Sequence, residues 1–434
     1  MRESEFFYEN SLIGKSLIND YLKKLEPEIK KLNESLNLRY TSEYGFINLP
    51  DDRALILKIK NLTLQKKEND LEYLVVIGIG GSSLGTIAIL EAIKGKFYNL
   101  LHNTPKIIFV ESLDTFYLTQ VIHLLEDSFK SGKKVLLNLI SNSGTTTESI
   151  ANFEILIAVM KKYIDNYHKY VVVTTDKGSL LNKIAIENRF EVLETPNLVS
   201  GRFSVLSAVG FFPLALLGID IEKLVYGAKV MRKRCLSIKE NPAAINAIVM
   251  YLSNQGKKNI YESLFFSIEL EALGKWYRQL VAESVGKEFT KFGNKINAGI
   301  TPTVAIGSND MHSMFQLYIA GPKDKLLHII SLDKTPSINI PKHIEYSNLV
   351  NNIQNKPAAI IMGAIIKSVK LSFKERSIPF TECLLNSNDE FSVGEFLMMK
   401  QIEVIYLAYL FMVNPFDQPN VELYKENLKK LLKR

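Results

Sequence analysis

Residues 135–148 read Val-Leu-Leu-Asn-Leu-Ile-Ser-Asn-Ser-Gly-Thr-Thr-Thr-Glu, and this stretch carries most of the information about the fold. Its first six residues have the length and apolar character of a buried strand, and apolar residues recur behind it at helical spacing, at Ile150, Phe153, Ile157 and Met160. Five hydroxyl side chains are therefore expected between a strand and a helix N-terminus. Free backbone N–H groups and the positive end of the helix dipole favour an anion there, so the stretch predicts a phosphate-binding loop.

A ligand-free explanation covers part of the same loop. Thr145 and Glu148 have the spacing of a capping box, in which side chains satisfy the first N–H groups of a helix. A capping box leaves Ser141, Ser143 and Thr146 unexplained, so the anion-site interpretation is preferred.

Short apolar runs alternate with helical stretches on both sides of this loop. The candidate strands are residues 74–79, 107–110, 135–140 and 170–174, followed after a helical middle by 303–306 and 325–332. This alternation is typical of parallel sheets covered by helices on both faces, so we expect an α/β protein with two such units. Pro336, Pro341 and Pro357, with several Asn between them, predict a long surface excursion rather than a linker.

The composition is that of a globular protein with material for two domains. The chain has 434 residues, of which 47% are hydrophobic and 23% charged, so neither disorder nor a fibrous structure is expected. The formal net charge is +7, but Lys and Arg are spread along helical segments and are not gathered with aromatic residues. We therefore expect no nucleic-acid binding. The excess charge either steers small anionic substrates or belongs to a solvated lysine-rich surface.

The sequence gives no sign of export, of a membrane span or of a metal site. The first residues are charged where a signal peptide needs an apolar core, and the most hydrophobic stretches, 205–219 and 404–413, are shorter than a bilayer span. Both stretches are interpreted as buried helices. Cys235 and Cys383 cannot form a disulfide framework, and neither they nor the histidines show metal-ligand spacing. We expect a cytoplasmic protein with no cofactor.

A second loop, Gly-Ile-Gly-Gly-Ser-Ser-Leu-Gly, follows the first candidate strand at residues 78–85. It matches a dinucleotide-binding fingerprint poorly, because Ser83 stands where the third Gly or Ala belongs and no acidic residue lies about 20 positions on. The loop is either a tight packing turn or, through Ser82, a neighbour of a sugar hydroxyl or phosphate. In a parallel sheet both loops would lie at the carboxyl ends of strands, where ligands bind.

Arg202 and Glu283 are candidate site residues outside these loops. Arg202 precedes an apolar helix, where the dipole disfavours a cation unless an anion lies between them; the alternative is a surface arginine paired with a carboxylate. Glu283 lies in the last turn of a helix and shares a face with Gln279. The dipole and the apolar neighbours favour proton uptake by Glu283, which suits a general base. An ordinary ion pair with Lys287 or Arg278 is the alternative.

His312 and Lys425 are weaker candidates when each is taken alone. His312 follows Asn309 and Asp310, either of which can cap a helix, and a histidine in a first helical turn is largely neutral and able to exchange a proton. A lone histidine is more often structural. Lys425 lies in the helix that Pro419 opens, and by itself it indicates only a surface lysine.

Taken together and in order, these segments resemble the glucose-6-phosphate isomerase (phosphoglucose isomerase) family in its shorter, bacterial-type form. The resemblance runs from about Tyr73 to Lys425 and is loose before Leu62. It implies two sugar-isomerase domains of doubly wound α/β type. The expected division is an N-terminal helical segment 1–62 that packs on the second domain, a first domain 63–215, a second domain 216–410 and a C-terminal helical tail 411–434.

The resemblance also implies a reaction and an assembly. Family members isomerise glucose 6-phosphate and fructose 6-phosphate reversibly, by ring opening and proton transfer through a cis-enediol, in glycolysis and gluconeogenesis. The expected protein is a homodimer that binds hexose phosphate at a cleft between domains and at the dimer interface. The residue types fit, because this reaction needs a poised carboxylate, a cation over the developing oxyanion and a proton relay.

The resemblance assigns substrate contacts to several of the residues already named. Those matched to the family's phosphate-binding loop are Ser141, Ser143, Thr145 and Thr146. Those matched to sugar contacts and substrate positioning are Gly81, Ser82, Gln279 and Gln418.

The catalytic assignments also come from the resemblance. Glu283 matches the base that moves the proton between C1 and C2, and Arg202 matches the arginine that stabilises the enediolate. His312, which the family supplies from the neighbouring subunit, matches the residue that helps open the ring. It is supported by Lys425 and oriented by the carboxylate that matches Glu148.

Two positions depart from the family pattern. Asn142 stands where family members often have Lys, which removes a positive charge beside the phosphate loop, and Ser200 replaces a second Gly.

Two other functions fit parts of the sequence. A non-catalytic sugar-phosphate sensor on the same fold would need the hydroxyl loops but not Glu283, His312 and Lys425. An NAD-dependent dehydrogenase is disfavoured by the poor dinucleotide fingerprint.

Overall fold

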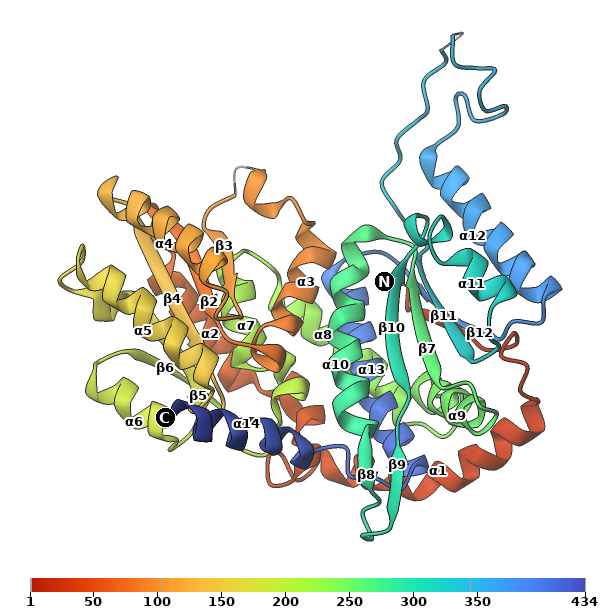
Figure 1. Ribbon diagram of the computed structural model, residues 1–434, viewed down its shortest axis with the longest axis horizontal. Helices are drawn as coiled ribbons and strands as arrows, with labels where there is room; N and C mark the ends of the chain where they lie inside the picture. Colours follow the sequence, from red (N-terminus) through yellow and green to blue (C-terminus); the bar gives the residue numbers. More distant parts are fainter. Residues whose placement is uncertain (1, 102, 344, 434) are drawn as a thin grey trace.

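Two five-stranded sheets stand side by side in the protein, with helices between them and over their outer faces (Figure 1). The structure is a computed structural model that describes residues 2–101, 103–343 and 345–433. Every strand pairing in these two sheets is parallel except that of β1 with β12, so the predicted α/β class with mainly parallel sheets is confirmed.

The first sheet is fully parallel and has the strand order β3-β2-β4-β5-β6. Its strands are β2 (Leu71–Ile77), β3 (Lys106–Val110), β4 (Lys134–Ile140), β5 (Val171–Asp176) and β6 (Glu191–Thr195). The helices that connect them are α3 (Leu84–Lys94), α4 (Thr115–Lys130), α5 (Thr147–Lys161) and α6 (Leu180–Glu187). Four of these strands coincide with the predicted ones to within a few residues.

Alternate side chains of β2 show why this sheet is covered on both faces. Val75 and Ile77 join a buried cluster with residues of α4 and α5, whereas Leu74 and Val76 join the cluster that includes α3. Successive side chains of a strand point to opposite faces, so a strand that is apolar throughout requires a layer of helices on each side.

The second sheet has the order β1-β12-β11-β7-β10 and is parallel except for β1, which runs antiparallel to β12. Its strands are β1 (Glu5–Phe7), β7 (Ile260–Phe265), β10 (Thr301–Ile306), β11 (Lys325–Leu332) and β12 (Phe380–Leu385). Strands β10 and β11 were predicted, whereas β1, β7 and β12 were not. A separate hairpin pairs β8 (Lys287–Phe289) with β9 (Lys295–Ala298).

Helices fill the space between the two sheets and extend to both ends of the molecule. Besides the four helices that connect the strands of the first sheet, the α-helices of the described chain are α1 (Lys15–Ser35), α2 (Arg53–Lys66), α7 (Ala208–Leu216), α8 (Ile221–Cys235), α9 (Pro242–Gln255), α10 (Glu271–Val285), α11 (Phe315–Ala320), α12 (Ala358–Glu375), α13 (Glu390–Leu410) and α14 (Pro419–Leu432). The two apolar stretches predicted as buried helices lie in α7 and α13, and almost every residue of both helices is buried. Among the described residues, none of the helices combines the length and apolar character that a bilayer span requires.

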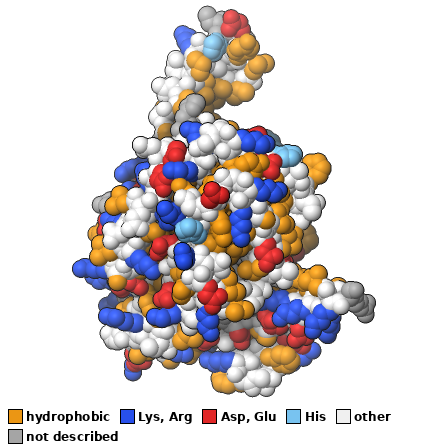
Figure 2. Space-filling model, turned by 90° about the vertical axis from the view of Figure 1, so that its left-hand side faces the viewer, with side chains coloured by type: hydrophobic (Ala, Val, Ile, Leu, Met, Phe, Trp, Pro, Cys, Tyr) orange, Lys and Arg blue, Asp and Glu red, His pale blue; other side chains and the backbone are white. Residues whose placement is uncertain are grey.

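The predicted surface excursion forms an arm, residues 333–343 and 345–357, that projects from the second sheet before α12 (Figure 1). One isolated bridge between Asn339 and Pro357 closes its base. On the face of the molecule drawn in Figure 2, blue and red side chains are interspersed and do not form a single basic patch. That distribution agrees with the expectation that the excess positive charge is spread out.

Candidate active site

The two predicted ligand loops lie side by side at one edge of the first sheet. Strands β2 and β4 are hydrogen-bonded neighbours, and their carboxyl ends lead into the glycine-rich loop 78–85 and the hydroxyl loop 141–146. The backbones approach so closely that a Cβ atom on Gly78 would lie 3.0 Å from the carbonyl oxygen of Ile140. This is the edge of a parallel sheet where ligands bind.

The hydroxyl loop is fixed on its inner side and open on its outer side. Ser141 is 2% exposed, its amide donates to the Thr174 carbonyl at 3.0 Å, and its Oγ accepts from the Gly144 amide at 3.2 Å. Ser143 and Thr145 are exposed, with their hydroxyl oxygens 3.1 Å apart. The loop thus presents two neighbouring hydroxyl groups to solvent from a backbone that is held in place.

The predicted capping box of Thr145 and Glu148 is not formed. The N-cap of α5 is Thr146, which makes no capping bond with its side chain; its Oγ1 lies 3.4 Å from the Ser141 Oγ. Glu148 accepts a hydrogen bond of 2.6 Å from the hydroxyl of Tyr424, on α14. The first-turn N–H groups of α5 therefore have no side-chain cap, which is the arrangement that suits an anion.

The glycine-rich loop brings two other parts of the site into contact. A Cβ atom on Gly81 would lie 2.3 Å from the carbonyl carbon of Gly201, and one on Gly80 would lie 2.9 Å from Nε2 of Gln279. Gly80 has a φ of +59° as well. The absence of side chains at Gly80 and Gly81 therefore allows the segment that carries Arg202 and the helix that carries Gln279 to approach this edge of the first sheet.

Arg202 is the centre of the site and is 3% exposed. It lies within the short 3₁₀ helix Gly201–Leu206, which precedes α7 as predicted. All five N–H donors of a guanidinium are engaged here. Their acceptors are Ser284 Oγ at 3.0 Å, Glu283 Oε2 at 3.3 Å, Gln418 Oε1 at 2.6 Å, the Asp417 carbonyl at 3.2 Å and the Pro415 carbonyl. Burial lowers the pKa of Arg202, and the carboxylate of Glu283 counteracts that effect.

Glu283 and Gln279 share one face of α10, as predicted, and Gln279 Nε2 donates to Glu283 Oε1 at 3.0 Å. The carboxylate of Glu283 is paired with Arg202 rather than with Lys287 or Arg278. The Oε1 atom of Gln279 is buried and has no hydrogen-bond partner among the described residues. The side chain of Glu283 is 33% exposed, so the carboxylate lies between the buried arginine and solvent.

A short segment after α13, residues 414–418, holds Arg202 from the other side, and we call it the strap. Besides the three acceptors that it offers to Arg202, the strap is tied to Lys287, whose Nζ lies 2.9 Å from Asp417 Oδ1. Lys287 is 7% exposed, and burial lowers its pKa, while Asp417 counteracts that effect. Ser284, Asp417 and this role of Lys287 were not predicted from the sequence.

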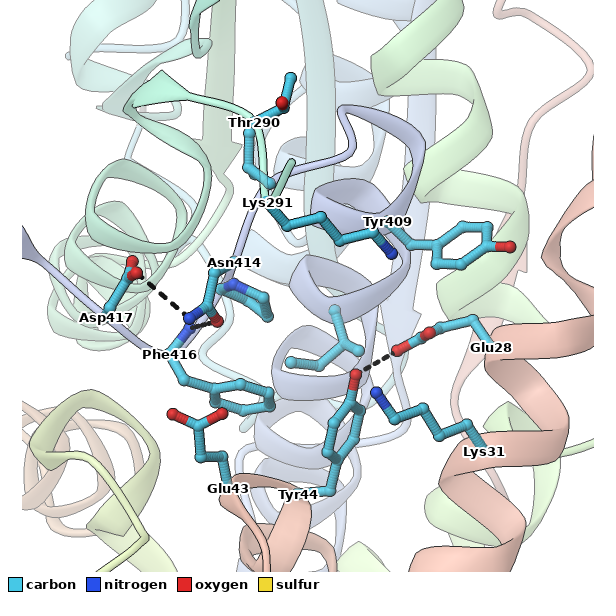
Figure 3. A pocket seen from close by; sticks show the side chains of 13 residues that line it. Glu28, Lys31, Glu43, Tyr44, Thr290, Lys291, Tyr409, Asn414, Phe416 and Asp417 are labelled. Atoms are coloured by element: carbon cyan, nitrogen blue, oxygen red, sulfur yellow. Dashed lines mark hydrogen bonds between the residues drawn. The ribbon is translucent and has the colours of Figure 1, made fainter. Parts of the chain in front are cut away.

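A cavity of about 410 Å³ lies on the strap (Figure 3). Its walls come from α1, the segment of Glu43 and Tyr44, α13, the Thr290 and Lys291 region of the β8–β9 hairpin and the strap itself. On one side Tyr44 donates to Glu28 at 2.7 Å, and on the other the side-chain amide of Asn414 donates to Asp417 Oδ2 at 3.1 Å. Because Asp417 belongs to this wall and also holds Lys287, the cavity and the arginine site share the strap.

His312 is not close to these groups within one chain, and it does not lie in the first turn of a helix as predicted. It follows the 3₁₀ turn Asn309–Met311, and α11 begins only at Phe315. Strands β7 and β10 end at the same edge of the second sheet, where α10 begins, and Glu283 lies at the far end of α10. Helix α10 has 15 residues and therefore spans about 22 Å. His312 is exposed at the edge opposite to Glu283.

Lys425 likewise remains at the surface. It lies on α14, its side chain is 47% exposed, and Nζ is 2.7 Å from Glu422 Oε1. The structure therefore brings Glu283, Arg202, Gln279 and Gln418 together with the glycine-rich loop, but it does not join Lys425 to His312. In the described part of the chain, there is no cluster of three or more His, Cys, Asp or Glu side chains placed to hold a metal ion.

Known proteins resemble this chain over nearly its whole length. The family model described as phosphoglucose isomerase matches residues 64–434. A probable glucose-6-phosphate isomerase of Methanococcus maripaludis is 31% identical over 431 residues, 98% of this chain and 93% of that protein. The glucose-6-phosphate isomerase of Methanocaldococcus jannaschii is 31% identical over 435 residues, 98% of this chain and 99% of that protein.

A solved structure agrees with these matches at the level of the fold. The crystal structure of a glucose-6-phosphate isomerase from Chlamydia trachomatis aligns with 99% of this chain and 88% of its own, with a TM-score of 0.83 and 19% identity. At that identity the likeness shows the arrangement of the two sheets and their helices.

Proposed function

The chain belongs to the phosphoglucose isomerase family, and from this premise we propose that it interconverts glucose 6-phosphate and fructose 6-phosphate. The observation that carries the proposal is the contact between a half-buried carboxylate, Glu283, and a fully buried arginine, Arg202, beside two open loops at a sheet edge. A sensor would need only the loops. The relatives named as isomerases and the presence of this pair favour the enzyme.

The phosphate of the substrate is assigned to the hydroxyl loop. Ser143 and Thr145 are exposed with their hydroxyl oxygens 3.1 Å apart, and Ser141 and Thr146 complete the loop that matches the family. The uncapped N-terminus of α5 adds N–H donors and the positive end of a helix dipole. Phosphate held there would contribute binding energy that orients the reacting carbons.

Proton transfer is assigned to Glu283. In the open-chain aldose, the carboxylate removes the proton from C2, the electrons form the C1–C2 double bond and the carbonyl oxygen becomes the enediolate oxygen. A proton then passes from the hydroxyl oxygen on C2 to the oxygen on C1, and as the C2 oxygen becomes the carbonyl the same carboxyl group returns its proton to C1, which gives the ketose. Its position beside Gln279, whose Oε1 lacks a partner among the described residues, supports a role for that amide in binding a substrate hydroxyl.

Arg202 is assigned to the enediolate. Its charge is buried at 3% exposure, so the interaction with a negative oxygen would be little screened by water. Because every N–H donor is already used, a substrate oxygen has to displace one of the present acceptors. The NH1 group binds Glu283 and Gln418, both of them residues that the family pattern assigns to the substrate, so we propose that NH1 is the donor that exchanges.

Ring opening is assigned to His312 of a second subunit, with Lys425 and Glu148 in supporting roles. Within one chain His312 is exposed at the edge of the second sheet remote from Glu283, so only another copy can bring it to this site. The arm supports a homodimer because Ile338, Tyr346 and Leu349 on it are 72%, 62% and 78% exposed. Apolar groups gathered on a projecting segment are typical of protein contacts.

Both cysteines are free and buried, which suits the reducing cytoplasm in which we propose that the enzyme acts.

The test is conversion of fructose 6-phosphate by the purified protein in EDTA, with glucose 6-phosphate trapped by a coupled dehydrogenase. The expected result is turnover without added metal. Binding of fructose 6-phosphate without turnover would replace the isomerase with a sugar-phosphate sensor on the same fold.

A further inference from the structure

A fully buried polar cluster lies between the second sheet and the helices that carry the site. Lys400 and Glu403 lie one turn apart on α13, both are 0% exposed, and Nζ is 2.9 Å from Oε2. Nζ also lies 3.1 Å from Nε2 of His328, on β11, which is 0% exposed as well. Charges in such surroundings are tolerated only when they are paired and hydrogen-bonded.

The cluster is a closed ring of hydrogen bonds whose direction can be worked out. Lys400 has only donors, so Nε2 of His328 accepts and the ring hydrogen is on Nδ1, which donates to Thr381 Oγ1 at 2.8 Å. Thr381 donates to Asn246 Oδ1 at 3.2 Å, and Asn246 Nδ2 donates to Glu403 Oε2 at 2.8 Å. Burial lowers the pKa of His328 well below its usual value, in agreement with a neutral imidazole.

Tyr277 connects this ring to the helix that carries the proposed base. Its hydroxyl donates to Glu403 Oε1, and burial raises its pKa well above the usual value, so the phenol keeps its hydrogen. Tyr277 lies on α10, as do Gln279 and Glu283. The bond to Glu403 therefore ties α10 to α13 six residues before Glu283.

Helix α13 supports the segment that carries Arg202 in two ways. Gln401, next to the ring, donates to the carbonyl of Phe203 at 3.0 Å, directly after the arginine in the sequence. The helix ends at Leu410 and leads into the strap, which supplies three of the five acceptors of Arg202. Helix α13 thus leads to three of the five acceptors of the arginine, while α10 carries the base and the other two acceptors.

We propose that the ring of Glu403, Lys400, His328, Thr381 and Asn246, joined to α10 by Tyr277, fixes the position of Glu283 relative to Arg202. The inference rests on the proposed isomerase function. Tyr277 and Glu403 are positioning residues, since neither reaches the substrate. Proton transfer between two carbons by one carboxylate depends on its placement to well under 1 Å, so release of α10 from α13 lowers the rate of the chemical step more than it weakens binding.

The test compares Tyr277→Phe with Tyr406→Phe. Tyr406 is a matched control because it is as deeply buried as Tyr277 (0% and 1% exposed) and also donates one buried hydrogen bond, but to the Cys235 carbonyl at the end of α8, at 2.6 Å, rather than to the ring. The measurements are kcat, KM, melting temperature and the deuterium incorporated from solvent into product per turnover. The last quantity reports how well the base retains the transferred proton.

For Tyr277→Phe we expect kcat to fall at least about tenfold, KM to stay within about twofold and solvent deuterium incorporation to rise, whereas Tyr406→Phe keeps kcat and incorporation near wild type. Equal kcat in the two variants, with only the melting temperatures lowered, would overturn the proposal.

A second variant tests the same hydrogen bond in case Tyr277→Phe does not fold. Glu403→Asp keeps the charge opposite Lys400 but withdraws the carboxylate from Tyr277 by one methylene, and it should reproduce the fall in kcat and the rise in deuterium incorporation. Wild-type kcat in Glu403→Asp would count against the positioning role. Absence of turnover in the wild-type protein is a different outcome, because it refutes the isomerase assignment and the inference with it.

Discussion

The NH1 atom of Arg202 lies 3.3 Å from Oε2 of Glu283, and this contact joins two parts of the molecule that are 81 residues apart in sequence. Arg202 follows the last strand of the first sheet, and Glu283 ends a helix that packs on the second sheet. The proposed base and the proposed oxyanion partner are thus supplied from different sheets, and the relative position of the sheets is part of the chemistry.

Glu283→Gln is expected to abolish turnover. The amide keeps the shape of the side chain and its contact with Gln279, but it cannot accept the proton from C2. General-base catalysis contributes about 10²–10⁴-fold, so kcat should fall by at least that range, while substrate affinity stays within a few-fold. Affinity measured by calorimetry with fructose 6-phosphate and kcat measured by the coupled assay separate the two effects. A variant with near-normal kcat would show that another group is the base.

Ser143→Ala combined with Thr146→Ala is expected to raise KM for the phosphorylated sugar by at least about tenfold, because hydrogen bonds to a charged group contribute roughly 1.5–3 kcal/mol each. Thr119→Ala is the control, since its hydroxyl is exposed and donates only to the Thr115 carbonyl of its own helix. An unchanged KM in the double variant would remove the phosphate from this loop.

Glu283→Gln and His312→Ala test whether the site is shared between subunits. Each variant alone is expected to be inactive. Co-expressed in equal amounts, they should form about one-half mixed dimers, each with one intact site, and recover about a quarter of the wild-type activity. If His312 served its own chain, every site would carry a defect and no activity would return.

Gly81→Ala is expected to destabilise the protein and to disturb the site. The added Cβ would lie 2.3 Å from the carbonyl carbon of Gly201 and 2.6 Å from the backbone nitrogen of Arg202, and these backbone atoms cannot rotate away. Overpacking of this kind costs about 1–3 kcal/mol, which urea denaturation would measure. Gly14→Ala is the matched control, because a Cβ atom added there would meet nothing within 4 Å and the φ of −65° suits any residue. Equal stability of the two variants would contradict the close approach.

Glu395 should make the stability of the protein depend on pH. It is 0% exposed, and burial raises its pKa to about 7, although two hydrogen bonds from Ser4 to its carboxylate oppose that effect. Between the ordinary glutamate pKa and 7, the folded state keeps a proton that the unfolded state has lost. Stability from this group is therefore present at low pH and is lost as the pH rises through 7.

The comparison with Glu395→Gln isolates that contribution. From pH 5 to pH 8, the free energy of unfolding of the wild type should fall relative to the variant by on the order of 2 kcal/mol. A difference between the two proteins that does not change with pH would show that the carboxyl group titrates normally.

The sequence predicted strands in which a single buried polar residue interrupts the apolar run, as Asn138 does in β4 and His328 in β11, but it missed β7 and β12, where two polar residues stand together. Strand β12 includes Thr381, and β7 includes Glu262 and Ser263, all of them buried. These side chains interrupt an apolar run, and the partner that makes Thr381 tolerable in the core comes from His328, far away in the sequence. No local pattern can reveal such a partner. The division at residues 62, 215 and 410 stays a prediction.

The same reason separates the site residues that were predicted from those that were missed. Motif-bearing side chains such as Glu283 and Arg202 were named as candidate site residues from the sequence, and their roles stay proposals. Two of the acceptors around Arg202 are backbone carbonyls, of Pro415 and Asp417, and a carbonyl carries no signal of residue type. The capping box failed because the helix begins one residue later than the motif requires.

Strand β1 has a consequence for the order in which the protein is made. Glu5 pairs with Leu384, so a strand made early finds its place only after about 380 further residues have been synthesised. Until then the outer edge of the second sheet cannot be closed, and sequence-distant pairing of this kind slows folding. The first sheet, whose strands all lie between residues 71 and 195, can assemble early in synthesis, whereas the second cannot be completed before β12, residues 380–385, has been made.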